Sequence, residues 1–188
     1  NLCFCHLFRH LTFMDANVMK AFKYVFVLAS ATDIERLASI KNASSEAKKT
    51  LYVCSNFMAS TMKFFTERES SLSRGLFNFS PRMLRLNGLD RIKKKGFVLI
   101  AGTSQISRVK KLLKELPIEE TLLIYSSWEG YYTIPEQIAA NPGYKNFREL
   151  FYNIVDIHTS GHADKTTIKR VIETIKSKEV IVIHKEGD

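Results

Sequence analysis

The sequence predicts an α/β fold of three layers, in which a mainly parallel sheet is flanked by helices. Short apolar runs rich in β-branched residues recur along the chain and alternate with longer amphipathic segments. This alternation is typical of parallel strands joined by helices. The runs are apolar almost without interruption, as expected of strands that are covered on both faces.

Six apolar runs are predicted to be the strands of this sheet. They cover residues 24–28, 51–54, 97–101, 121–125, 154–157 and 180–183. Helices are predicted at 33–42, at 57–67, at 106–116, as two short helices around a turn within 134–152, and around an apolar stripe at residues 168, 171, 172 and 175. The serine-rich stretch 66–82 shows no clear periodicity and is predicted to be a long loop or an excursion before the next strand.

Composition narrows the class of protein and its partners. The 188 residues include 28 Lys plus Arg against 19 Asp plus Glu, a net charge of +9 that suits a polyanionic partner. The three cysteines are too few and too odd in number for a disulfide framework, so a cytoplasmic protein is expected. The apolar first fourteen residues carry an arginine and two histidines, so neither a signal peptide nor a membrane span is expected.

The densest positive stretch runs from Arg91 to Lys95, with Arg82 and Arg85 nearby. Such a stretch can line a groove that follows a nucleic-acid backbone, and residues 82–95 are expected to share one strand-end surface with residues 102–104 and 160–162. The alternative is a solvated loop that precedes the strand at 97–101.

Small hydroxyl residues follow several of the predicted strands. They are Ser30, Thr32, Thr103, Ser104, Ser126 and Ser127. Ligands of open α/β sheets bind outside the carboxyl ends of the strands, so these side chains are candidate phosphate contacts. The alternative is that Thr32, Ser104 and their neighbours only cap helices. No GxGxxG or GxxxxGK[ST] motif is present, so a dinucleotide or P-loop site is not supported.

The strongest signal lies near the C-terminus. Residues 158–163 read HxSGHA, between a predicted strand and a predicted helix, and His184 ends the next predicted strand. If the two strands are neighbours, His162 and His184 lie at adjacent carboxyl ends and share one site.

This strand–HxSGHA–helix–strand–His pattern resembles the closing motifs of metallo-β-lactamase-fold nucleases of the β-CASP branch, the group that includes ribonuclease J. The resemblance implies a zinc-dependent hydrolase that cleaves phosphodiester bonds of RNA or DNA. It implies that His162 is the catalytic residue, which assists proton transfer at the scissile phosphate, and that His184 is a zinc ligand. The substrate-binding residues expected with them are Ser160, Gly161, Ser126, Ser127, Thr103 and Ser104.

The preceding chain is similar to the Rossmann-like β-CASP domain inserted in that family, at residues 25–37, 97–104 and 125–131. The expected organisation is an N-terminal segment, partly disordered, at 1–22, a β-CASP-like α/β domain at 23–152, and the closing strand–helix–strand of a metallo-β-lactamase lobe at 153–188.

The metal-binding half of the family pattern is missing. The family holds its zinc ions with an HxHxDH motif, and no two of the five histidines here form HxH. Lys185 also stands where the family has a small residue. These departures indicate the C-terminal portion of a longer hydrolase, or a degenerate copy, that is inactive alone and does not bind zinc fully.

Two alternatives stay open, a non-catalytic nucleic-acid-binding Rossmann-like module and an unrelated Rossmann-like domain with incidental histidines. The partners expected are nucleic acid, with RNA preferred over DNA, and the missing metal-binding lobe. No membrane partner is expected, and a homodimer is left open.

Overall fold

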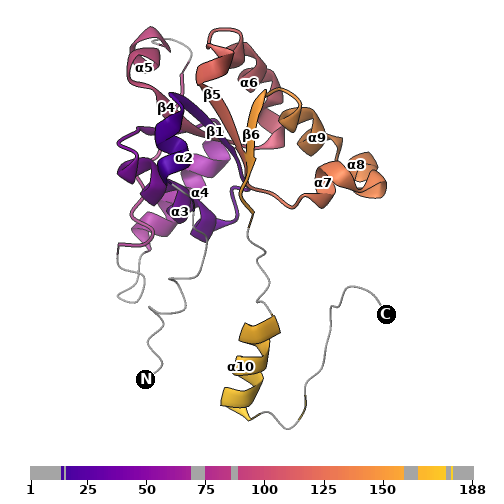
Figure 1. The fold of residues 1–188 in the computed structure, drawn as a ribbon. Helices are drawn as coiled ribbons and strands as arrows, with labels where there is room; N and C mark the ends of the chain where they lie inside the picture. The colour runs from indigo at the N-terminus through magenta and orange to yellow at the C-terminus, as the bar shows by residue number, and fades with distance from the viewer. Residues whose placement is uncertain are drawn as a thin grey trace.

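The computed structural model describes residues 14, 16–68, 75–85, 89–158, 165–176 and 179. Within these residues six strands form one sheet, in the order β3-β2-β4-β1-β5-β6, and every pairing between neighbours is parallel. Figure 1 labels β4, β1, β5 and β6 of this sheet. The strands are β1 (Tyr24–Leu28), β2 (Leu51–Val53), β3 (Arg82–Met83), β4 (Phe97–Ala101), β5 (Thr121–Tyr125) and β6 (Asn153–Asp156). The predicted α/β fold with a mainly parallel sheet is confirmed.

Helices occupy most of the segments between the strands. They are α2 (Ala16–Ala21), α3 (Ile34–Glu46), α4 (Asn56–Glu67), α5 (Leu89–Lys95), α6 (Ile106–Leu113), α7 (Gly130–Thr133), α8 (Pro135–Ala140), α9 (Pro142–Arg148) and α10 (Lys165–Ile175), with 3-10 turns at Thr103–Gln105 and Ile118–Glu120. The predicted pair of short helices is confirmed as α8 and α9, and each begins with a proline, which suits the first turn of a helix. No helix in the described ranges is long and apolar enough to cross a membrane.

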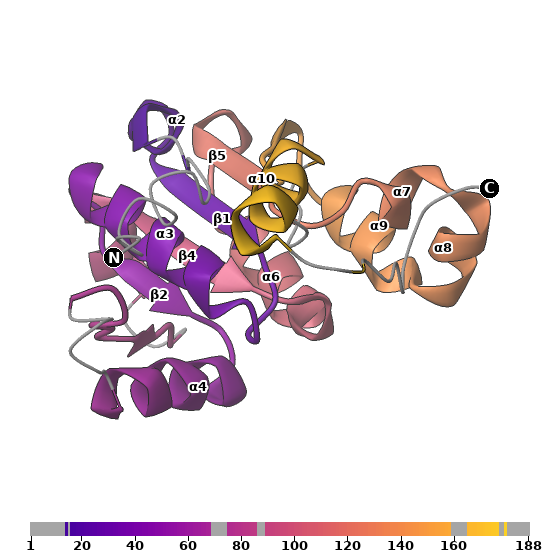
Figure 2. The same cartoon turned by 90° about the horizontal axis from the view of Figure 1, so that it is seen from below.

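The sheet separates two layers of helices. The side chains of Val25 and Val27 in β1 pack with residues of α2, α3 and α4, whereas Phe26 and Leu28 pack with residues of α6 and α9. Because successive side chains of a strand point to opposite faces, β1 is buried at all five positions, as are β4 and β5. Figure 2 shows α7, α8 and α9 grouped together beside the sheet.

One strand of the described sheet was not predicted from the sequence. Residues 66–82 were expected to form a long loop or an excursion, but β3 begins at Arg82 and pairs with β2 through Tyr52–Arg82 and Val53–Met83. A two-residue edge strand leaves too short an apolar pattern to be recognised. The predicted strand at 180–183 lies outside the described residues. Among the six strands of the described sheet, β3 is therefore the one that the sequence did not predict.

β6, the last strand among the described residues, belongs to the same sheet as the others. β6 pairs with β5 over four residues, from Leu122–Asn153 to Tyr125–Asp156. The chain therefore passes through this sheet once more before it reaches the HxSGHA motif. The predicted division at residue 153 falls immediately before that last strand.

Candidate functional site

The carboxyl ends of β1, β5 and β6 are neighbours in the sheet. Leu28, Tyr125 and Asp156 end these strands in register. The pairing continues one residue further, because the Ser126 N–H donates to the Leu28 carbonyl and the Ile157 N–H donates to the Tyr125 carbonyl. The hydroxyl residues after β1 and β5 therefore lie beside His158, which follows β6.

A buried arginine from α3 joins these three strand ends. Arg36 is 5% exposed, and its Nε lies 2.7 Å from Oδ2 of Asp33. Its Nη1 donates to the carbonyl of Ser126 at 2.7 Å and to the Ser126 hydroxyl at 2.9 Å, and lies 3.1 Å from Nδ1 of His158. A buried cation is costly unless it is paired and hydrogen-bonded, and Arg36 meets both conditions.

The contact with Arg36 assigns the tautomer of His158. A guanidinium can only donate hydrogen bonds, so Nδ1 of His158 accepts and the imidazole proton resides on Nε2. Partial burial of the ring lowers the pKa of His158, and the Arg36 cation lowers it further, against smaller opposing effects of Asp33 and Glu129. His158 is therefore a neutral side chain at pH 7 with an N–H donor on the side away from Arg36.

The second candidate loop follows β4, on the other side of β1. The Gly102 N–H donates to Oε1 of Gln105 at 2.8 Å, which closes the 3-10 turn that carries Thr103 and Ser104. The start of α9 lies directly on this turn, since a Cβ at Gly143 would be 3.0 Å from Cβ of Thr103. Thr103 and Ser104 thus occur at the same edge of the sheet as His158.

The alternative that Thr32 and Ser104 cap helices is wrong. The side chain that caps α3 is Asp33, which accepts from the Arg36 N–H, while the Thr32 hydroxyl lies 2.8 Å from that of Ser30. α6 has no side-chain cap, and the Ser104 hydroxyl accepts from the amide of Gln105. The hydroxyls of Thr32 and Ser104 therefore do not satisfy N–H groups at the start of a helix.

The structure separates the two serines after β5. Ser126 is 4% exposed and its hydroxyl accepts from Arg36, so it stabilises the buried side of the site. Ser127 is partly exposed. Ser160, Gly161, His162 and His184 lie outside the described residues, so their predicted convergence stays a prediction.

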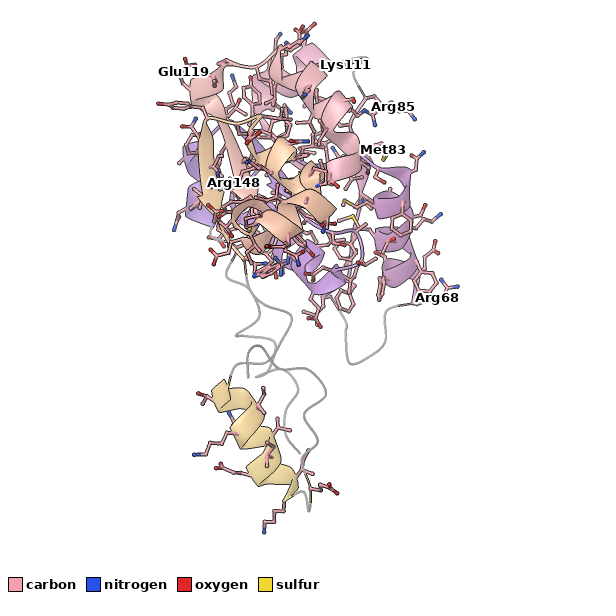
Figure 3. All side chains as sticks on the ribbon, turned by 90° about the vertical axis from the view of Figure 1, so that its right-hand side faces the viewer. Arg68, Met83, Arg85, Lys111, Glu119 and Arg148 are labelled. Atoms are coloured by element: carbon pink, nitrogen blue, oxygen red, sulfur yellow. The ribbon has the colours of Figure 1, made fainter. Side chains whose placement is uncertain are left out.

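The basic stretch lies at the amino ends of the strands, opposite the carboxyl ends that form this site. Residues 91–95 belong to α5, so the alternative that they form a loop is wrong, and α5 leads directly into the amino end of β4. Lys93 is paired with Glu115 at 3.1 Å. In Figure 3, Arg85 and Lys111 also lie toward the end of the molecule where the strands begin. The expectation that this stretch and residues 102–104 form one surface is therefore corrected.

Sequence reasoning missed Arg36, although a signal for it is present. Arg36, Ile40 and Ala43 lie on one face of α3, and all three are buried. An arginine on an otherwise apolar stripe must find buried partners, so it marks a polar cluster. Its partners at residues 126 and 158 could not be named without the strand order.

The described residues do not form a zinc site. Among them, no group of three or more His, Cys, Asp or Glu side chains could hold a metal ion. Nδ1 of His158 faces the Arg36 cation, which disfavours a metal ion at that nitrogen. No chemical step through zinc follows from the described part of the chain.

Comparison with known proteins supports the C-terminal interpretation. Residues 151–187 match the family model RMMBL, described as the Zn-dependent metallo-hydrolase RNA specificity domain. This segment begins just before β6 and includes His158, the HxSGHA motif and α10. No curated protein matches the chain. The match supports, at the level of the superfamily, the resemblance to metallo-β-lactamase and β-CASP hydrolases.

Proposed function

We propose that this chain is the RNA-contacting part of a zinc-dependent metallo-hydrolase of the β-CASP branch, a ribonuclease that cleaves phosphodiester bonds. The observation that carries the proposal is the contact of Arg36 with both Ser126 and His158. This contact holds together the residues that follow β5 and β6, and His158 lies within the segment that matches an RNA specificity domain. RNA is preferred over DNA because the matched model describes RNA specificity.

The roles of individual residues follow from their place at this edge. Thr103, Ser104 and Ser127 contact phosphate. Ser126 instead accepts hydrogen bonds from Arg36 and so holds the Arg36 side chain in place. Ser160 and Gly161 shape the turn that presents His162 for proton transfer, and His184 contributes one zinc ligand. Because the sequence has no HxHxDH motif, the other zinc ligands come from outside these 188 residues.

The face of α10 supports a further lobe as partner. Ile168, Val171 and Ile175 lie on one side of this helix and are 49%, 47% and 68% exposed. Large aliphatic side chains at helical spacing are ordinarily covered. We propose that the metal-binding lobe packs against these side chains.

A salt series on the 188-residue chain tests RNA binding. The affinity for a fluorescently labelled single-stranded RNA, measured by anisotropy, should fall steeply between about 50 and about 200 mM salt. Thr103→Val should weaken binding about tenfold, because it removes a hydroxyl that donates to phosphate. Thr61→Val, a matched change at a partly exposed position of α4, should leave binding unchanged. Weak binding that does not respond to salt would contradict the proposal.

A measurement of RNA hydrolysis distinguishes the proposed hydrolase from the alternative function, a nucleic-acid-binding Rossmann-like module without catalysis. The absence of HxHxDH favours that module for the isolated chain. Both predict RNA binding and no cleavage by the 188 residues with added zinc. A hydrolase predicts in addition that His162→Ala abolishes cleavage in a protein that also carries the metal-binding lobe. Cleavage by the isolated chain that is lost on chelation would overturn the claim of an incomplete metal site.

A further inference from the structure

Three aromatic side chains form a connected set next to the candidate site. The rings of Tyr131 and Tyr144 stack, with centroids 4.2 Å apart and planes at 13°. The ring of Trp128 meets Tyr131 edge to face, at 5.5 Å and 79°. We name Trp128, Tyr131 and Tyr144 the aromatic shelf.

Trp128 is fixed on one face and open to solvent. A Cβ at Gly130 would lie 2.5 Å from Cη2 and Cζ2 of the indole, so the ring lies directly over this glycine. The carbonyl of Trp128 accepts from the hydroxyl of Tyr125 at 3.4 Å. Trp128 is nevertheless 37% exposed. A ring that is already held in place loses little conformational freedom when another ring stacks on it.

The shelf lies against a candidate phosphate loop. The contact between Gly143 and Thr103 places the start of α9, and with it Tyr144, beside the loop after β4. Ser127 immediately precedes Trp128 in the chain. Aromatic faces and hydroxyl donors therefore occur side by side at one edge of the sheet.

We propose that the aromatic shelf is a nucleobase-stacking subsite for single-stranded RNA. An unpaired base lies on the open face of Trp128, and its adjoining phosphate is held by the hydroxyls of Thr103 and Ser104. The inference rests on the proposed function and adds the substrate class. Every base has a π face, so the subsite tolerates any sequence, but a base inside a duplex is already stacked.

An acidic side chain follows the indole in the sequence. Glu129 is exposed, and its carboxylate repels a phosphate that approaches it. Glu129→Gln should strengthen the binding of RNA.

The emission of Trp128 provides the test, because it is the single tryptophan of the chain. Titration with a short oligouridylate should quench this emission with the same dissociation constant that anisotropy gives for the labelled strand. An abasic strand of the same length supplies the phosphates alone, and it should bind more weakly without quenching.

Substitutions give the second readout. Trp128→Leu should weaken binding tenfold or more, whereas Trp128→Phe, which keeps an aromatic face, should retain most of the affinity. Tyr152→Leu is the matched control, since Tyr152 is an aromatic side chain, 81% exposed, that precedes the amino end of β6. Urea unfolding of each variant separates loss of binding from loss of folding.

The outcomes distinguish this inference from the proposed function. RNA that binds wild type and Trp128→Leu equally, without quenching, overturns the shelf and leaves the proposed function standing. Equal quenching by the abasic strand or by double-stranded RNA also overturns the shelf. If wild type binds no RNA even at low salt, the proposed function itself is wrong.

Discussion

Nη1 of Arg36 lies 3.1 Å from Nδ1 of His158, although the two residues are 122 positions apart in the sequence. This contact ties the start of α3 to the chain that leaves β6 and enters the HxSGHA motif. It depends on the parallel pairing of β1, β5 and β6, which places residues 126 and 158 at the same edge of the sheet.

Arg36→Met should destabilise the protein by about 3 kcal/mol, because it removes the cation that pairs with the Asp33 carboxylate and takes the Arg36 donor away from the Ser126 carbonyl. Urea unfolding followed by circular dichroism measures the loss. Arg68→Met is the control: Arg68 is exposed over Phe64, and its loss should cost about 0.5 kcal/mol. Equal effects of the two substitutions would contradict the buried role of Arg36.

The pKa of His158 should lie below that of an ordinary histidine. Because burial and Arg36 lower the folded-state pKa, the unfolded chain binds the proton more readily as the pH falls below about 6.5. The free energy of unfolding should therefore decrease on acidification from pH 7 toward the folded-state pKa, and level off below it. His158→Gln, whose amide oxygen can still accept from Arg36, should lack this part of the pH dependence.

Two-dimensional NMR of the imidazole nitrogens gives a direct measurement of the same contact. Nδ1 of His158 should show the shift of an unprotonated nitrogen at neutral pH, and Arg36→Met should raise the pKa of His158. A His158 that titrates normally in wild type would show that the Arg36 contact does not persist in solution.

Cys54 should resist thiol reagents in the folded protein. The residue is 4% exposed, and burial raises the pKa of its thiol to about 11, against a smaller opposing effect of Arg108. At pH 8 only about one thiol in a thousand would be ionised, and the thiolate is the reactive form. In a Cys3→Ser, Cys5→Ser background, modification should follow the urea unfolding curve. Rapid modification without urea would contradict the burial of Cys54.

Gly96 should tolerate alanine less well than Gly75. Both have positive φ, +70° and +84°, so alanine costs about 1 kcal/mol at either position from backbone strain. At Gly96 the new Cβ would also collide with the carbonyl of Lys23, whereas nothing lies within 4 Å at Gly75. Gly96→Ala should therefore cost roughly 1 to 3 kcal/mol more in urea unfolding. Equal costs would show that the α5–β4 turn can move away from β1.

The sequence predicted a strand accurately where the strand has a long run of apolar residues. β1, β4 and β5 carry five consecutive buried residues each, and all three were predicted with their bounds. β3 has two residues and is defined only by its pairing with Tyr52 and Val53. The basic residues 91–95 were placed at the wrong edge because charge alone does not show on which side of a strand its helix lies.

The candidate site shows the same limit. Ser126 and Ser127 were recognised as residues that follow a strand, since that relation is local. Their different environments come from Arg36, which approaches from α3 and buries one hydroxyl. Such a contact depends on strand order, which a single sequence does not determine.

Alanine substitutions should therefore separate these two adjacent serines. Ser126→Ala removes an acceptor of the buried Arg36 and should cost about 1 kcal/mol in urea unfolding, with RNA binding altered only as far as Arg36 and His158 shift. Ser127→Ala should leave stability within about 0.5 kcal/mol but weaken RNA binding several-fold, since a partly exposed hydroxyl beside Trp128 can reach phosphate. Anisotropy and urea unfolding on both variants provide the comparison. If Ser126→Ala alone weakens binding while Ser127→Ala is silent, the phosphate contact belongs to the Arg36 cluster rather than to the exposed loop.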